Sequence, residues 1–265
     1  IDIGQSFETT YEMFQGKDPR FLASIYVPGS SLLGSTMQFQ RGLILKDGSK
    51  YYAQSAPGPS YLLETYIDPE TQRKDTIFGK DGGTYTGDAS KTGFNIRKFV
   101  NENLKTEAQW DFGKTETSFP IFRLAEVYLN LAEAAVEMGK YQTEAFEAIK
   151  KIRDRAGVVT PFAVVDVEKV RHERQVELAF EGHRFWDMKR WRIAHLPVDQ
   201  GGLNGFRGAG LHPFFDLRIR KYVFEVANDL PKRQRVFTEK NYYTKFSGND
   251  MNSNPSLIQN PEFLN

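Results

Sequence analysis

The chain has 265 residues and a nearly balanced charge, with 35 Lys and Arg against 34 Asp and Glu, a net charge of +1. This balance excludes the strongly basic surface that is typical of proteins that bind nucleic acid or anionic membranes. The absence of cysteine excludes disulfides and thiol chemistry, and no apolar run in the sequence reaches the length of about 20 residues that spans a bilayer. Aromatic residues make up 14% of the chain, and many of its 12 tyrosines lie outside the segment with helical periodicity.

Residues 1–118 are rich in Gly, Pro, Ser and Thr, and no apolar period persists there for four helical turns. Such frequent turn-forming residues predict a lobe of long loops with short helices and hairpin strands. The Asp47-Gly48 pair predicts a hairpin turn. Residues 93–100 alternate loosely between apolar and polar, which favours a short strand.

Residues 119–195 form a predicted helical block. The first helix has one apolar stripe at steps of three and four residues, made of Leu124, Val127, Tyr128, Leu131, Ala135 and Met138. The second helix places on one side Ala145, Ala148, Ile149, Ile152 and Ala156. Gly139 and Gly157 are the predicted helix ends.

Small alanines predict a closely packed antiparallel hairpin of these two helices, which resembles one tetratricopeptide unit of about 34 residues. A single repeat of this kind cannot bury its own apolar face. The rest of its stack is therefore expected from other helices of this chain, from an absent segment or from a partner.

A third predicted helix covers residues 170–191 and places Glu173, Glu177 and Glu181 on one face. A glycosidase needs two carboxylates that approach a bond from different directions, whereas these three point the same way. The spacing of Glu181 and His183 does not fit the Glu-x-x-His pairs of di-iron proteins. The sequence therefore favours a structural ion network that fixes how the helices dock, made of Glu173, Arg174, Glu177, Glu181, Arg184, Asp187 and Arg190.

Residues 196–265 return to loops. Tyr222 to Val226 predict a short strand, and residues 197–213 predict a flexible connection because of their many glycines. The four histidines, His172, His183, His195 and His212, show no zinc-ligand spacing, so we expect no metal and no cofactor.

Several motifs together resemble the C-terminal region of the SusD/RagB family. They are RLAEVYLNLAEA (residues 123–134), IRDRAG (152–157) and ERQVELAFEGHRFWDMKRW (173–191). Asp18-Pro19-Arg20 resembles the DPR element of the family, and Asn254-Pro255 with Gln259-Asn260-Pro261 resembles its ending. The matches cover nearly the whole chain in the order that the family shows.

The resemblance implies a mainly α, SusD-like fold with a tetratricopeptide-type hairpin and a loop-rich lobe. It implies a single domain over 1–265, divided into a lobe (1–118), a helical block (119–195) and a loop-rich C-terminal part (196–265). Family members are longer, and their N-terminal part, with further helices and a lipidated cysteine, is expected to be absent here. The implied protein is a lipid-anchored, surface-exposed outer-membrane lipoprotein of Bacteroidetes that captures glycans for a TonB-dependent, SusC-like transporter.

Carbohydrate recognition needs flat aromatic faces together with polar groups for sugar hydroxyls, usually on loops. From residue chemistry alone, the candidates for ligand binding are Trp110, Tyr51, Tyr52, Gln54, Tyr61, Tyr66 and Tyr85. Each of them is also compatible with a structural role, since loop tyrosines commonly pack their rings. Two function classes remain open, a non-enzymatic glycan-binding component and a purely structural or protein-docking module.

Overall fold

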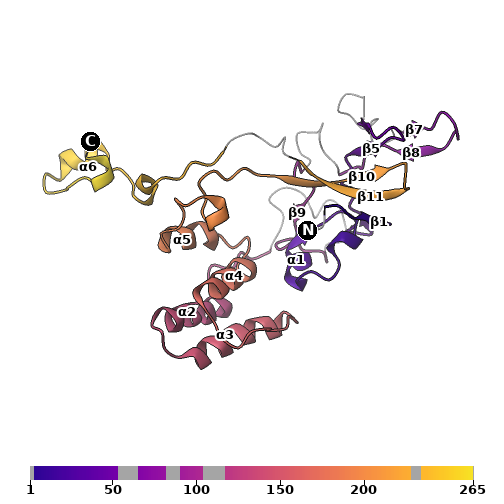
Figure 1. The fold of residues 1–265 in the computed structure, drawn as a ribbon. Helices are drawn as coiled ribbons and strands as arrows, with labels where there is room; N and C mark the ends of the chain where they lie inside the picture. The colour runs from indigo at the N-terminus through magenta and orange to yellow at the C-terminus, as the bar shows by residue number, and fades with distance from the viewer. Residues whose placement is uncertain (1–2, 53–64, 82–89, 104–116, 228–233, 265) are drawn as a thin grey trace. The chain divides into compact units, whose positions relative to one another are not determined.

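The computed structural model describes residues 3–52, 65–81, 90–103, 117–227 and 234–264. The chain divides into two compact units, one made of Ile1–Glu181 and Ala209–Leu230, the other of Gly182–Gly208 and Pro231–Asn265. Within the described residues, no helix is long and apolar enough to cross a membrane. Figure 1 shows the elements of the fold.

A mixed five-stranded sheet lies in the first unit, in the order β1-β11-β10-β5-β6. Its strands are β1 (Ser6–Phe7), β5 (Gly42–Ile44), β6 (Lys50–Tyr51), β10 (Gly210–Asp216) and β11 (Lys221–Ala227). β10 runs antiparallel to β11 and parallel to β5. The predicted hairpin at Asp47-Gly48 joins β5 to β6, with Gly48 at a φ of 85° and its amide bonded to the carbonyl of Leu45.

Short elements complete the loop-rich part of the first unit. The helix α1 (Pro19–Ser24) leads into β2 (Ile25–Tyr26), which pairs with β9 (Asn95–Ile96), and this pair confirms the strand predicted within residues 93–100. Two further hairpins are β3 (Ser31–Leu32) with β4 (Ser35–Thr36), and β7 (Thr65–Ile67) with β8 (Lys74–Thr76).

The mainly α prediction is wrong in its proportions, because the described residues are 32% helical and 17% strand. One reason is the strand β10, which begins inside the segment predicted to be a flexible connection. The glycines of residues 197–213 led to the prediction of a connection, and Pro213, which lies within this strand and lacks an amide donor, also weakens the strand signal. The strand predicted at residues 222–226 is confirmed by β11.

The helices α2 (Leu124–Glu137) and α3 (Gln142–Arg155) form the predicted hairpin, side by side in Figure 1. The buried side of α3 agrees with the prediction and consists of Ala145, Ala148, Ile149 and Ile152. The likeness of the hairpin to a tetratricopeptide unit stays a prediction.

The apolar stripe predicted for the first helix is only partly buried. α2 buries Leu129, Ala132 and Ala135 against α3 and α4, and of these only Ala135 belongs to the predicted stripe. Leu124, Leu131 and Met138 are 63%, 47% and 58% exposed. Helical periodicity alone could not choose between the two sides, since both carry apolar residues.

The third predicted helix is also wrong as one element, because it is divided into α4 (Val167–Glu177) and α5 (His183–Arg190). Phe180 and Gly182 between them have φ angles of 67° and 82°, which lie in the left-handed region and end the helical path. α4 packs in the first unit against α2. α5 lies in the second unit with the helix α6 (Gly248–Ser253) and a small core of Met188, Ala194 and Phe237.

Candidate functional site

A buried ion network surrounds α4. The carboxylates of Glu173, Glu177 and Glu181 belong to residues that are only 2%, 3% and 5% exposed. Glu173 and Glu177 lie one turn apart on α4, and Glu181 lies in the turn that follows it. Buried carboxylates are costly unless cations pair with them.

Arg20 connects α1 to α4. Its Nη1 atom donates to Glu173 Oε1 at 2.5 Å and to Glu177 Oε2 at 3.1 Å. Asp18 caps α1 by accepting from the backbone amide of Arg20, and it also holds the guanidinium through Nε and Nη2. These hydrogen bonds lower the pKa of Asp18. On the other side, Arg153 of α3 donates to Glu173 Oε2 at 2.7 Å.

Arg123, directly before α2, links the other two carboxylates. Its Nη1 donates to Glu177 Oε1 at 2.7 Å, and its Nε donates to Glu181 Oε2 at 2.7 Å. Arg155 Nη2 also reaches Glu177 Oε1, at 2.8 Å, and Lys98 Nζ reaches Glu181 Oε1, at 2.5 Å. Each carboxylate therefore bonds at least two cations from other elements, an arrangement that fixes α1, α2 and α3 on α4.

The other residues predicted for this network contact different partners. Arg174 is buried on α4 and donates to Asn130 of α2 at 2.8 Å. Arg184, Asp187 and Arg190 belong to the second unit, where Arg190 Nη2 contacts Asp187 Oδ1 at 3.1 Å and the Arg184 guanidinium lies 6.0 Å from the Trp191 ring centre.

A polar groove of about 590 Å³ lies beside α1 and the turn that follows β9. Its lining consists of Leu22, Ala23, Arg97, Lys98, Val100, Asn101, Glu102 and Asn103. The pairing of β2 with β9 positions this turn, and the backbone amides of Arg97 and Lys98 both donate to the carbonyl of Ser24 at the end of α1.

One wall of the groove is held rigid by a three-residue contact. Arg97 donates through Nε and Nη2 to the two oxygens of Glu102 at 2.6 and 3.0 Å, and the hydroxyl of buried Tyr26 donates to Glu102 Oε1 at 2.7 Å. Burial and this hydrogen bond raise the pKa of Tyr26, and Arg97 and Tyr26 lower the pKa of Glu102. Near neutral pH the phenol is therefore protonated and the carboxylate ionised.

Two amide side chains complete the groove. Asn101 Oδ1 accepts from the backbone amide of Asn103 at 3.1 Å, which closes the turn. The side chain of Asn103 is exposed. The groove thus combines amide donors and acceptors with a charged wall and the aliphatic side chains of Leu22 and Val100. The groove can donate hydrogen bonds to a ligand rich in hydroxyl groups and accept hydrogen bonds from it.

A sequence model described as the SusD family matches residues 2–263. The chain belongs to the SusD family. Its match to the SusD-like protein P2 of Formosa agariphila is 31% identical and covers 34% of this chain and 20% of that relative. SusD-like protein P25 of the same organism is 39% identical over 28% of this chain and 15% of its own length.

Two solved structures are similar. One is a SusD-like carbohydrate binding protein from Bacteroides fragilis, 27% identical, covering 70% of this chain and 31% of that one with a TM-score of 0.44. The other is the surface glycan-binding protein A from Bacteroides uniformis, which is 21% identical. This match covers 75% of this chain and 36% of that one, with a TM-score of 0.43. The chain therefore spans about a third of the length of each of these two chains.

Two SusD-family motifs that lie far apart in the sequence meet in the ion network. Arg20 of the DPR element contacts Glu173 and Glu177 of the ERQVEL motif. Neither motif by itself connects to the other. The cations not predicted for the network are Arg20, Lys98, Arg123, Arg153 and Arg155. All of them except Lys98 lie in the family motifs, Arg20 in the DPR element, Arg123 in RLAEVYLNLAEA and the other two in IRDRAG.

The structure describes three of the predicted ligand-binding residues, Tyr51 of β6, Tyr52 directly after it and Tyr66 of the hairpin strand β7. Tyr51 and Tyr66 have ring centres 5.5 Å apart and pack against the core cluster around Leu43. Tyr52 contacts Phe214 edge to face, with ring centres 5.9 Å apart. The other candidates, Gln54, Tyr61, Tyr85 and Trp110, lie outside the described residues. Asn101 and Asn103 were not among the predicted residues, and their only signal in the sequence is a short polar run.

Proposed function

We propose that this protein is a non-enzymatic glycan-binding component of an outer-membrane nutrient uptake system. The observation that carries the proposal is the polar groove beside α1, in a chain of the SusD family. Delivery of the ligand to a TonB-dependent, SusC-like transporter is part of the proposal. So are lipid anchoring and exposure at the cell surface, which the family resemblance implies for the longer protein.

The groove fits a saccharide in size and in chemistry. Its volume of about 590 Å³ lies within the usual range of roughly 300 to 1,000 Å³ for ligand sites. Sugar hydroxyls need both donors and acceptors, and the amides of Asn101 and Asn103 offer both. The Arg97–Glu102 pair is held in place by its own hydrogen bonds and by Tyr26, and this pre-ordering reduces the ordering cost of binding.

Trp110 remains a proposed platform for a sugar ring. It belongs to residues 104–116, which follow Asn103, the last residue of the groove, directly in the sequence. An aromatic side chain supplied from this segment would add the flat apolar face that the described lining lacks.

The carboxylates in and directly after α4 do not suit glycoside hydrolysis. Glu173, Glu177 and Glu181 are each held by two or more cations, and the pKa of Glu181 is lowered by Arg123 and Lys98 against the effect of burial. A glycosidase general acid needs a raised pKa and access to the leaving group. Glu181 has neither property.

Affinity electrophoresis against a panel of polysaccharides, followed by calorimetry on each hit, tests the proposal. We expect retention by one polymer class with no reducing ends released. Asn103→Ala removes an exposed amide and Asn101→Asp keeps the turn-closing oxygen while removing the amide donor. Each change should weaken binding about tenfold, since one lost hydrogen bond in a desolvated site costs about 1 to 2 kcal/mol.

Asn252→Ala is the matched control, because it removes an exposed amide from α6 in the other unit. Its binding should equal that of the parent chain. Full retention by both groove variants would exclude the groove as the glycan site, and release of reducing ends would contradict the non-enzymatic role. Trp110→Ala should abolish retention if its ring is the platform.

A purely protein-docking role is the second candidate function. One specific observation favours it, the exposed apolar side of α2. Docking and glycan capture make different predictions. Substitutions on the exposed side of α2 would weaken only protein docking, and substitutions in the groove would weaken only glycan binding.

A further inference from the structure

The polar groove beside α1 contains charged residues whose contacts restrict the kind of ligand that it can take. Its described lining has two cations, Arg97 and Lys98, and one carboxylate, Glu102. A count of charges alone would favour an anionic ligand, because the cations outnumber the carboxylate. An anion binds strongly where the N–H groups of a cation are directed at it, so the hydrogen bonds of Arg97 and Lys98 decide the preference.

Lys98 directs its ammonium group into the ion network. Its Nζ atom donates to the carbonyls of Glu177 and Ala179, at 3.3 and 2.8 Å, and to Glu181 Oε1 at 2.5 Å. An ammonium group has three N–H donors, and these three acceptors match them in number. The donors of Lys98 are therefore taken up by the protein itself.

Arg97 is committed to Glu102. Its Nε and Nη2 atoms donate to the two carboxylate oxygens at 2.6 and 3.0 Å, and its Nη1 atom donates to the carbonyl of Leu22 at 3.1 Å. All three nitrogens thus donate to protein oxygens. The two parallel hydrogen bonds to Glu102 fix the guanidinium in place and balance its charge.

Glu102 is the charged group that offers the groove an open acceptor. Its side chain is 38% exposed. Oε1 accepts from both Tyr26 and Arg97, whereas Oε2 accepts one hydrogen bond, from Arg97, among the described residues. A carboxylate oxygen can accept two hydrogen bonds, so Oε2 has capacity for a hydroxyl group. Since Arg97 and Tyr26 lower the pKa of Glu102, this carboxylate is ionised near neutral pH.

We propose that the groove selects a neutral glycan over a carboxylated or sulfated one. A sugar hydroxyl donates to Glu102 Oε2, whereas an anionic substituent there would meet a like charge. The uncharged amides of Asn101 and Asn103 can bind either kind of glycan, so Glu102 makes the distinction. This inference rests on the proposed glycan-binding function and adds the chemical class of the glycan.

Matched polymer derivatives are the probe. Starch, dextran, laminarin and galactomannan are each used unmodified, as a hydroxyethyl derivative and as a carboxymethyl derivative. The two substituents are similar in size and differ in charge. In calorimetry on the full chain, the hydroxyethyl derivative of a polymer that binds should bind about tenfold more tightly than its carboxymethyl derivative, because of the like charge at Glu102.

Salt separates the effect of charge from that of bulk. Raising the salt from about 20 mM to about 500 mM shortens the screening length from roughly 20 Å to roughly 4 Å. The difference between the two derivatives should therefore narrow. A steric cause would leave the difference unchanged.

Two variants connect the preference to the groove. Glu102→Gln keeps the shape and removes the charge, so the ratio of the two affinities should fall from about tenfold to about twofold or less. Asn103→Lys adds a cation at an exposed position and should reverse the preference without a change to the Arg97–Glu102 contact. Glu144→Gln, at an exposed position of α3 outside the groove, is the matched control and should keep the ratio of the parent. Circular dichroism checks the folding of each variant.

Equal binding of the hydroxyethyl and carboxymethyl derivatives would overturn the inference. Preferential binding of alginate or polygalacturonate, two polymers that are anionic by nature, would overturn it as well. Both outcomes would still support the glycan-binding function, since a polymer binds. Binding of no polymer would contradict that function itself, and the inference would fall with it.

A ratio that changes neither with salt nor in Glu102→Gln would also overturn the inference, because bulk rather than charge would then decide the preference.

Discussion

At the scale of single residues, the three carboxylates around α4 determine most of what can be tested. Glu177 is 3% exposed and bonds three guanidinium groups, those of Arg20, Arg123 and Arg155. Replacing both sides of such a network with apolar residues can be harmless, but removing one partner leaves buried charges without compensation.

Glu177→Ala should therefore lower the free energy of unfolding by about 3 to 5 kcal/mol. Arg20 and Arg123 would keep a contact with Glu173 or Glu181 but lose the carboxylate between them. Urea unfolding followed by circular dichroism measures the change. Glu137→Ala, an exposed position at the end of α2, is the control and should stay within about 0.5 kcal/mol of the parent. Equal midpoints for the two variants would show that the Glu177 face is solvated.

Glu181 makes the stability depend on acid pH. Burial alone would raise its pKa, but the hydrogen bonds from Arg123 and Lys98 lower it from the ordinary value of 4.5. As pH falls, the unfolded chain then binds the proton first, so protonation favours unfolding. The free energy of unfolding should be constant above about pH 5.5 and fall below about pH 4.5.

Glu181→Gln should flatten that decline, because it removes the titrating group while keeping the shape. Urea midpoints at a series of pH values from about 6 to 3 measure both curves. Asp18 keeps some slope in the variant, since its pKa is lowered in the same direction by Arg20. Parallel curves for the variant and the parent would exclude Glu181 as a contributor.

At the scale of elements, small side chains decide how closely the helices approach. Ala132 of α2 is fully buried, and Ala145 and Ala148 of α3 belong to the same core cluster. Ala134, two residues further along α2, is exposed. The two alanines of one helix thus give a direct comparison of buried and exposed surroundings.

Ala132→Leu should destabilise the chain by about 1 to 3 kcal/mol, because added methyl groups force packed side chains apart. Ala134→Leu should change stability by less than about 0.5 kcal/mol, since Ala and Leu have similar helix propensities. Thermal unfolding of both variants beside the parent measures the difference. A large loss for Ala134→Leu alone would mean that the exposed side of α2 has been assigned wrongly.

Element ends show where sequence reasoning worked. Gly139 and Gly157 follow α2 and α3 in left-handed conformations with φ of 62° and 69°, as a helix-ending glycine requires. The break between α4 and α5 was missed because Phe180 also adopts a positive φ, which an aromatic residue seldom does. The strand β10 was missed because the glycines of residues 197–213 predicted a connection, and Pro213 inside the strand weakens its signal further.

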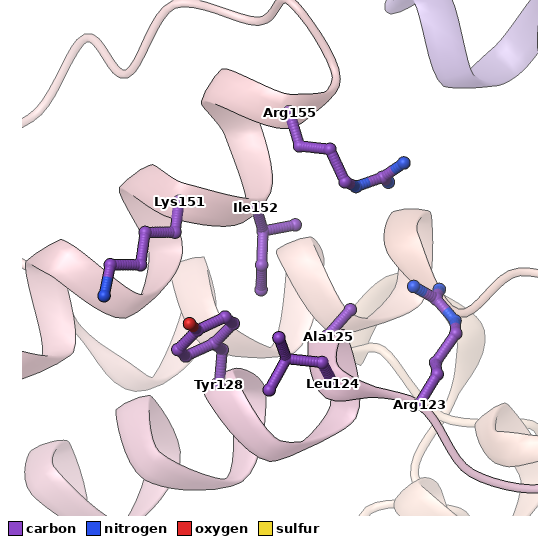
Figure 2. Close-up of a pocket in the computed structure, with 7 residues that line it drawn as sticks. All are labelled: Arg123, Leu124, Ala125, Tyr128, Lys151, Ile152 and Arg155. Atoms are coloured by element: carbon purple, nitrogen blue, oxygen red, sulfur yellow. The ribbon is translucent and has the colours of Figure 1, made fainter.

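At the scale of the whole molecule, segments distant in sequence supply the two candidate surfaces. The groove combines α1 with the turn after β9, and Lys98 of that turn bonds Glu181. Glu181 in turn bonds Arg123, which lines a pocket of about 260 Å³ between the start of α2 and the end of α3 (Figure 2). The ion network thus contacts both the groove and this pocket while leaving Asn103 exposed.

The sequence alone determined the features that depend on neighbouring residues. The periodicity of α2 and α3, their glycine ends, the strand β11 and the SusD-family motifs are all local patterns of about 5 to 20 residues. It also determined that Glu173 and Glu177 share one face, because helical spacing fixes this wherever the helix lies.

Only the tertiary structure decided which cations meet those carboxylates and which side of α2 is buried. Arg20, Lys98 and Arg123 come from other elements, and no local pattern connects them to α4. α2 carries apolar residues on two sides, so its periodicity permitted either orientation. The packing of α3 and α4 selected one, because burial depends on contacts between distant segments, which local patterns do not specify.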